Sequence, residues 1–191
     1  HRRPDIVCFV NGLPLAVIEA KRPDNHANKG PTIDEGVSQN IRNQCNDEIP
    51  HLFSYAQLLF SINGAEGRYG TQGTPSKFWA PWREEDIHEP EFYALKNKIL
   101  DADAKATLFA HRPSQDHTWY ENLIAGGELA VTEQDRLLIS LLSPARLLEM
   151  TRFYVLFDKK IGKVAARYQQ FFGIKRLIER INTKDKQGAR Q

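Results

Sequence analysis

The sequence opens with a pattern that permits few structures: two apolar runs joined by an Asn-Gly pair, RPDIVCFVNGLPLAVIEAKRP, residues 2–22. The alternation of apolar and other residues predicts β-strands over 5–10 and 13–20. Asn11-Gly12 between them is the strongest short signal for a tight hairpin turn. The first 22 residues are therefore expected to form an antiparallel β-hairpin.

Charged residues stand at the open end of this hairpin. Asp5 begins the first strand, and Glu19 and Lys21 end the second. Because side chains alternate between the faces of a strand, Glu19 and Lys21 share one face and Ala20 lies on the other. Two carboxylates on one face, a backbone carbonyl and water would form a hard oxygen site, which suits Mg²⁺ better than Zn²⁺. Lys21 beside such a site would orient an attacking water or stabilise transition-state charge.

The position of Asp5 depends on the turn. A two-residue turn would place Asp5 opposite Ile18, on the face away from Glu19. A three-residue loop over 10–12 would place Asp5 opposite Val17, on the same face as Glu19 and roughly 5–8 Å from it. The metal hypothesis therefore predicts an odd loop or a bulge. The alternative is an ordinary hairpin on which the charged side chains are solvated neighbours.

Composition describes a globular protein. Of the 191 residues, 41% are apolar and 26% charged, and no apolar run approaches the roughly 18 residues of a membrane helix. Cys8 and Cys45 show neither metal nor disulfide spacing. We expect a reducing, cytoplasmic setting without a membrane partner. Since the chain starts at His1 and its only methionine is Met150, it is expected to be a piece of a longer protein.

The remaining pattern predicts an α/β fold, a small mixed sheet with flanking helices, followed by a mainly helical segment. A mobile polar loop is expected over 22–32. Further elements of the sheet region are expected as a helix from about Ile33, a short helix over 49–57, and strands over 58–62 and 66–71. Beyond the Pro- and aromatic-rich stretch 74–86, Ser143-Pro144 predicts the start of a helix that continues through 157, and helical spacing recurs over 164–181.

Charge is unevenly distributed along the chain. The net charges of residues 1–83, 84–158 and 159–191 are +1, −7 and +8. The basic last segment is a weak indication of a polyanionic partner such as nucleic acid. A solvated helix face explains it equally well.

The hairpin sequence also resembles a known family. "RPD" followed by a hairpin and "EAK" resembles the PD-(D/E)xK nuclease signature, and residues 2–22 as a whole resemble the nuclease domain of the restriction (R) subunit of type I restriction-modification enzymes. The resemblance implies that Asp5 and Glu19 bind Mg²⁺ together with the backbone carbonyl of Ala20. It implies that Lys21 is the catalytic lysine.

The family carries a Gln-x-x-x-Tyr element in the helix after the hairpin. "SQNIRNQ" (38–44) matches its glutamine as Gln39, which is implied to act with the catalytic residues. The position four residues later is Asn43 instead of tyrosine, and its expected role is a contact with DNA. An ordinary polar residue of a helix is the alternative for Gln39.

The resemblance continues over 52–71 and 78–82, where it implies the strand pair that closes the nuclease sheet. Arg68 and Tyr69 in this stretch are expected to contact the DNA backbone by charge and stacking. A solvent-facing edge strand is the alternative.

"ARYQQFFGIKRLIERI" (166–181) resembles the segment ahead of the phosphate-binding loop in superfamily 2 motors. Arg167, Tyr168 and Gln169 would then contact the adenine of ATP in the full-length motor. No GxxxxGK[ST] motif is present in the chain, so we expect it neither to bind ATP tightly nor to hydrolyse it. An amphipathic basic helix is the alternative.

Together these resemblances imply an endonuclease module that hydrolyses double-stranded DNA, coupled in the full protein to ATP-driven translocation. Methylation and specificity subunits would be its partners. The implied organisation is an endonuclease core over 1–83 that lacks its N-terminal part, a helical connection over 84–158 and a basic lead-in to the motor over 159–191. The alternative is a catalytically inactive DNA-binding or subunit-docking domain on the same fold.

Overall fold

The computed structural model describes residues 3–23, 32–160 and 162–183, so most of the polar loop expected over 22–32 lies outside the described residues. The chain forms two compact units. The first consists of residues 1–86 together with 132–191, and the second of residues 87–131.

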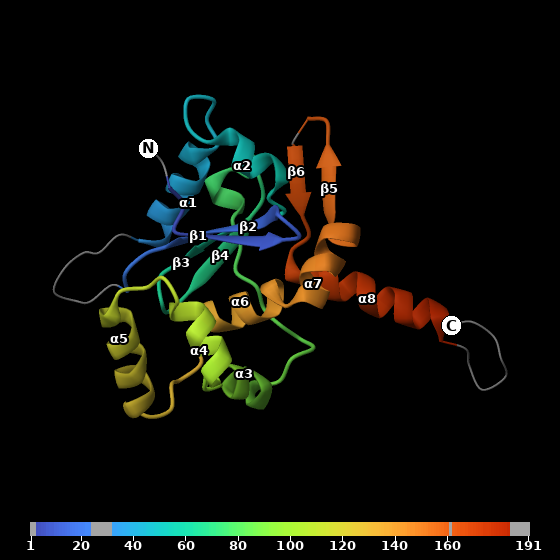
Figure 1. Ribbon diagram of the computed structural model, residues 1–191. Helices are drawn as coiled ribbons and strands as arrows, with labels where there is room; N and C mark the ends of the chain where they lie inside the picture. The colour runs from blue at the N-terminus through green and yellow to red at the C-terminus, as the bar shows by residue number, and fades with distance from the viewer. Residues whose placement is uncertain (1–2, 24–31, 161, 184–191) are drawn as a thin grey trace. The chain divides into compact units, whose positions relative to one another are not determined.

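Within the described residues, the first unit is built on a mixed four-stranded sheet of order β1-β2-β3-β4 (Figure 1). The outer pairs are antiparallel, whereas β2 and β3 run parallel and are connected through helices. The strands are β1 (Ile6–Val10), β2 (Leu13–Ala20), β3 (Leu58–Ile62) and β4 (Gly67–Gly70). The expected strands and the expected α/β class are confirmed.

The hairpin turn has two residues. Asn11 and Gly12 both have positive φ, 49° and 79°, as a tight hairpin turn of the Asn-Gly type requires. Val10 pairs with Leu13 across it. The three-residue loop considered for 10–12 is therefore wrong, because Asn-Gly supplies the two left-handed conformations at little steric cost.

A bulge follows the turn and changes the register. Phe9 pairs with Pro14, but Cys8 pairs with Ala16, so Leu15 is an additional residue on β2. From there the pairing continues regularly through the rest of β1. The predicted odd loop or bulge is thus present as a bulge, but the predicted pairing of Asp5 with Val17 is wrong, because Val17 pairs with Val7.

Helices cover both faces of the sheet (Figure 1). One face packs against α1 (Ile33–Asn43) and α2 (Pro50–Tyr55). The other packs against α6 (Glu133–Leu142), α7 (Pro144–Glu149), the π-helix η2 (Met150–Tyr154) and α8 (Tyr168–Asn182). The first unit is thus a three-layer structure with an apolar core on each side of the sheet.

Alternation along β2 assigns its side chains to the two cores. Ala16 and Ile18 point into the core that includes Leu137 of α6. Val17 points into the core beneath α1, and Glu19, two residues later, shares this face. The sheet therefore places a carboxylate on the side covered by α1.

The segment after α7 corrects the sequence interpretation. The helix expected through 157 ends in the π-helical turn, and β5 (Val155–Asp158) pairs antiparallel with β6 (Gly162–Ala165). The branched and aromatic residues of β5 favour a strand. Gly162, with a φ of 90°, lies where β6 begins and adopts a conformation that glycine favours.

The second unit contains α3 (Glu89–Lys96), α4 (Ala102–Phe109) and α5 (Ser114–Ala125). The Asp101 side chain caps α4 by accepting from the Ala104 N–H. Phe109 packs against the rings of His117 and Tyr120. The mainly helical character expected after the sheet is confirmed. Among the described helices of either unit, none has the length and apolarity of a membrane span.

Candidate active site

Two carboxyl groups meet at the open end of the hairpin. Because Ile6 pairs with Ile18, the bulged register places Asp5 directly opposite Glu19, and residues opposite each other in an antiparallel pair share a face. The backbone N–H of Ala20 donates a 2.8 Å hydrogen bond to Oδ2 of Asp5. The bulge therefore brings the two acids together, as the sequence argument required.

The environments of these two acids differ. Asp5 is exposed, whereas Glu19 has 0% of its surface accessible to solvent. Burial, together with the neighbouring carboxyl of Asp5, raises the pKa of Glu19 from 4.5 to about 7, against the opposing effects of Lys21 and Arg42. A proton or a cation between the two acids relieves their repulsion.

The two carboxylate oxygens of Glu19 differ in their hydrogen bonding. Its Oε1 accepts a 3.3 Å hydrogen bond from Nδ2 of Asn43. Its Oε2 has no hydrogen-bond donor among the described residues. An ionised, buried carboxylate oxygen without a donor is energetically costly, and such an atom is a natural ligand for a hard cation.

Lys21 stands beside the acids at the end of β2. Its backbone N–H donates to the carbonyl of Ile62 at 2.7 Å, which continues the pairing with β3. Its half-buried side chain donates a short hydrogen bond from Nζ to Oε1 of Gln39 on α1. Backbone and side chain are therefore both held in place.

Helix α1 approaches this end of the sheet closely because it carries a glycine there. A Cβ on Gly36 would lie 2.2 Å from Oγ of Ser61 and 3.5 Å from Cε of Lys21. The Ser61 hydroxyl donates to the carbonyl of Ile33 at 2.7 Å. Asn40 adds a 3.0 Å hydrogen bond to the carbonyl of Phe60. The close approach at Gly36 lets Gln39 and Asn43 reach the charged cluster.

The structure thus brings together five of the residues singled out in the sequence: Asp5, Glu19, Lys21, Gln39 and Asn43. The contact of Asn43 with Glu19 was not anticipated. The spacing of Gln39 and Asn43, four residues apart on one helical face, was the available signal.

Arg68 and Tyr69 belong to β4, which β3 separates from the strand that carries Glu19 and Lys21. Arg68 forms a 2.8 Å ion pair with Asp34 on α1. Tyr69 is 3% exposed, packs against Trp82 and donates a 2.7 Å hydrogen bond to the carbonyl of Ala166. Burial raises the pKa of its phenol. Tyr69 is therefore a core residue and does not offer its ring to DNA in this structure.

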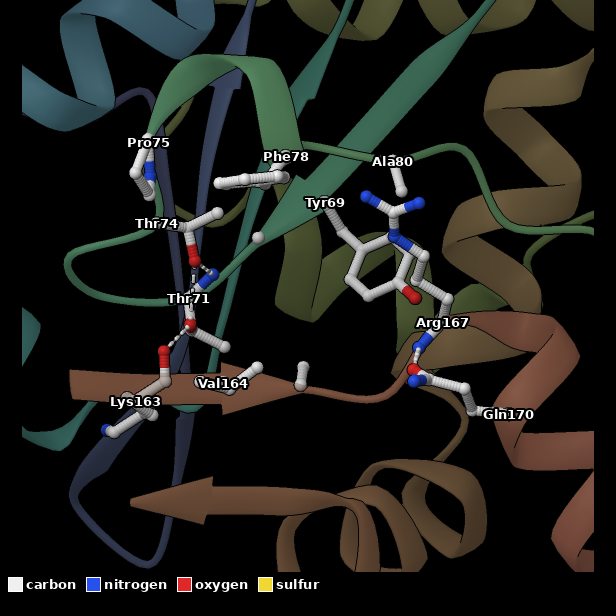
Figure 2. Close-up of a pocket in the computed structure, with 12 residues that line it drawn as sticks. Tyr69, Thr71, Thr74, Pro75, Phe78, Ala80, Lys163, Val164, Arg167 and Gln170 are labelled. Atoms are coloured by element: carbon white, nitrogen blue, oxygen red, sulfur yellow. Dashed lines mark hydrogen bonds between the residues drawn. The ribbon is translucent and has the colours of Figure 1, made fainter. Parts of the chain in front are cut away.

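The three residues matched to the adenine element lie at the start of α8. Arg167 lines a pocket of about 370 Å³ between β4 and β6, beside Tyr69 and Phe78 (Figure 2). Gln169 lines a neighbouring, mainly apolar pocket of about 410 Å³. Tyr168 is half-buried against the core of the sheet. The three side chains therefore do not share one pocket.

No group of three or more His, Cys, Asp and Glu side chains gathers in the part of the chain that the structure describes. The acids at the end of the hairpin are a pair, Asp5 and Glu19. Any cation there would need backbone carbonyl groups, such as that of Ala20, and water to complete its coordination.

The fold and this cluster define an α/β protein with an aspartate and a Glu-x-Lys sequence, Asp5 and Glu19–Lys21, at one end of a mixed sheet. Residues 1–78 match the family model described as Type I restriction enzyme R protein N terminus. This part of the chain is therefore similar to the N-terminal region of type I restriction enzyme R proteins, and the resemblance stated above is confirmed.

Relatives extend the similarity along the chain. A putative type I restriction enzyme MjaIXP endonuclease subunit of Methanocaldococcus jannaschii is 27% identical over 185 residues, which are 94% of this chain and 14% of that protein. The type I restriction enzyme HindI endonuclease subunit of Haemophilus influenzae is 28% identical over 183 residues, 93% of this chain and 14% of that protein. The chain thus spans about one seventh of the length of these curated relatives.

Proposed function

We propose that the chain is the endonuclease module of a type I restriction subunit and catalyses metal-dependent hydrolysis of phosphodiester bonds in double-stranded DNA. The observation that carries this proposal is the placement of Asp5 opposite Glu19 with Lys21 on the same strand end. The match of residues 1–78 to the R protein N terminus supports it.

The residues present fit a magnesium ion. Asp5 offers an exposed carboxylate, and Glu19 offers a buried oxygen, Oε2, to which no described residue donates. These two side chains and the Ala20 carbonyl would hold the ion. When bound, Mg²⁺ lowers the pKa of water and offsets negative charge on phosphoryl oxygens.

Two other residues of the cluster, Lys21 and Gln39, would place a positive charge beside the phosphodiester. Lys21 places an ammonium group beside the acids, and Gln39 fixes its position by accepting from Nζ. Such a charge stabilises the additional negative charge of a phosphodiester under attack. Glu19, deeply buried, keeps its carboxylate away from competing water, which strengthens its interaction with a cation.

In the full-length subunit we expect ATP-driven translocation to bring DNA to this site, and Arg167, Tyr168 and Gln169 to contact ATP once the motor completes their surroundings. Recognition of sequence and methylation would belong to partner subunits. The boundaries 1–83, 84–158 and 159–191 remain the predicted functional division.

The proposal is tested with the 191-residue chain and with the full-length subunit in its restriction-modification complex. Calorimetric titration with Mn²⁺ should show binding by the wild-type chain and by Lys21→Ala, but binding at least tenfold weaker for Asp5→Ala. Plasmid DNA should be cleaved by the wild-type complex and not by either variant. Undiminished cleavage by the Asp5→Ala complex would contradict the proposal and favour a catalytically inactive DNA-binding or subunit-docking domain.

A further inference from the structure

Asn43, the last residue of α1, contacts Glu19 of the candidate site and is itself buried. It is 1% exposed, and its Nδ2 lies 3.3 Å from Oε1 of Glu19. A side chain so deeply buried does not reach DNA in this structure. Its effect on the site therefore passes through the carboxylate that it contacts.

The contact makes the two oxygens of Glu19 unequal. Asn43 occupies Oε1 and leaves Oε2 without a donor among the described residues. Donation to one oxygen restricts rotation of the carboxylate, so the second oxygen keeps a fixed direction. Outer hydrogen bonds of this kind commonly orient metal-binding side chains.

Packing alone does not explain an asparagine at this position. Its Oδ1 is buried and has no hydrogen-bond partner in the described part of the chain, and a buried polar atom left unpaired costs about 1–3 kcal/mol. Asn40, one turn earlier, is equally buried, and its Oδ1 likewise has no partner among the described residues; it differs in its Nδ2, which donates to the carbonyls of Gly36 and Phe60. Asn40 joins α1 to the sheet, whereas Asn43 joins it to an acid.

We propose that Asn43 is a positioning residue that fixes the Glu19 carboxylate, so that Oε2 faces a divalent cation shared with Asp5. The inference rests on the proposed function and adds a residue to its site. It also gives α1 two roles, since Gln39 holds Lys21 while Asn43 holds Glu19.

The test compares Asn43→Leu with Asn40→Leu, two substitutions of similar size at buried positions one helical turn apart. Mn²⁺ binding to the 191-residue chain is measured by calorimetry at pH 8, with the folded fraction determined by circular dichroism under the same conditions. Asn43→Leu should raise the Kd for Mn²⁺ by roughly 10–100-fold, as loss of an outer hydrogen bond usually does. Asn40→Leu should lower the midpoint of urea unfolding but change the Kd of the folded protein by less than about threefold.

Asn43→Ala provides a second variant if the leucine is not accommodated. A folded Asn43 variant that binds Mn²⁺ with the wild-type Kd would overturn the inference while leaving the proposed function intact. Equal weakening by Asn40→Leu and Asn43→Leu would overturn it as well, because the effect would then follow from packing. If the wild-type chain itself binds no Mn²⁺, the proposed function fails and the inference fails with it.

Discussion

Glu19 lies directly across the β1–β2 hairpin from Asp5, and burial together with the Asp5 carboxyl raises its pKa from 4.5 to about 7. The folded protein consequently binds this proton more tightly than the unfolded chain does. Its free energy of unfolding should therefore decrease as the pH rises from about 4.5 to about 7, by on the order of 3 kcal/mol in all.

Glu19→Gln should remove this pH dependence, because the amide stays neutral throughout. In EDTA, urea unfolding at pH 5 and pH 8 should give closer midpoints for the variant than for the wild type, with the variant the more stable at pH 8. Glu66→Gln, at an exposed glutamate of the turn before β4, is the control and should retain the wild-type difference. A wild-type midpoint that increases between pH 5 and pH 8 would contradict the raised pKa.

Gly36 and Ser61 should be energetically coupled. Alanine at 36 would place Cβ 2.2 Å from the Ser61 hydroxyl, and overpacking of this kind costs about 1–3 kcal/mol. Ser61→Ala removes that oxygen at the expense of its hydrogen bond to Ile33. In urea unfolding, the double variant should be destabilised by less than the sum of the two single variants. Strict additivity would show that the helix moves away instead.

Gln39 should matter for the rate of hydrolysis more than for metal binding. Gln39→Leu deprives the Lys21 ammonium of its acceptor, and a displaced catalytic group costs up to about 10²-fold in rate. Cleavage by the complete enzyme should slow markedly, while the Kd of the 191-residue chain for Mn²⁺ stays within about threefold. Gln39→Glu keeps an acceptor oxygen and should retain more activity than the leucine variant. A leucine variant with the wild-type rate would exclude a role for the contact.

Substitution of Arg146 should lower the free energy of unfolding more than substitution of an arginine in an exposed ion pair. Its guanidinium contacts the carboxylates of Glu84 at 3.3 Å and Asp86 at 3.0 Å, with side chains of Arg146 and Glu84 only 9% and 1% exposed. Removing one partner of a buried ion pair costs about 3–5 kcal/mol, so Arg146→Ala should shift urea unfolding strongly. Arg136→Ala, whose pair with Glu133 is largely exposed on the acid side, should cost about 1 kcal/mol or less. Similar shifts of the urea midpoint for Arg146→Ala and Arg136→Ala would contradict a larger stabilising effect of the buried Arg146–Glu84 ion pair.

Much of the sheet was predictable from the sequence, since β1, β2 and β3 are short apolar runs and Asn-Gly pairs precede β2 and β4. The register was not fully predictable. Asn11-Gly12 indicates a two-residue turn, and the requirement that Asp5 and Glu19 meet pointed to an irregularity. Pro14 was the available local signal for the bulge, because proline has no N–H to donate in a central strand and is found at strand starts and bulges.

The β5–β6 hairpin and the role of Asn43 were missed for different reasons. Residues 153–157 carry aromatic and aliphatic side chains that suit a helix or a strand, and tertiary pairing with β6 decided the outcome. Asn43 was interpreted through the family pattern, where tyrosine stands. Its burial against Glu19 follows from how far α1 approaches the sheet, which Gly36 determines.

The three-layer unit is assembled from two stretches of chain that an entire helical unit separates. Phe60 and Tyr69 are synthesised early, but their packing partner Phe171 follows the helical unit. During translation, the face of the sheet that packs against α8 therefore lacks part of its cover until α8 has been synthesised. A truncated protein ending near residue 83 would leave this face of the sheet exposed to solvent, and we would expect it to aggregate. Residues from 132 onward are therefore needed in any attempt to isolate the hairpin and its acids.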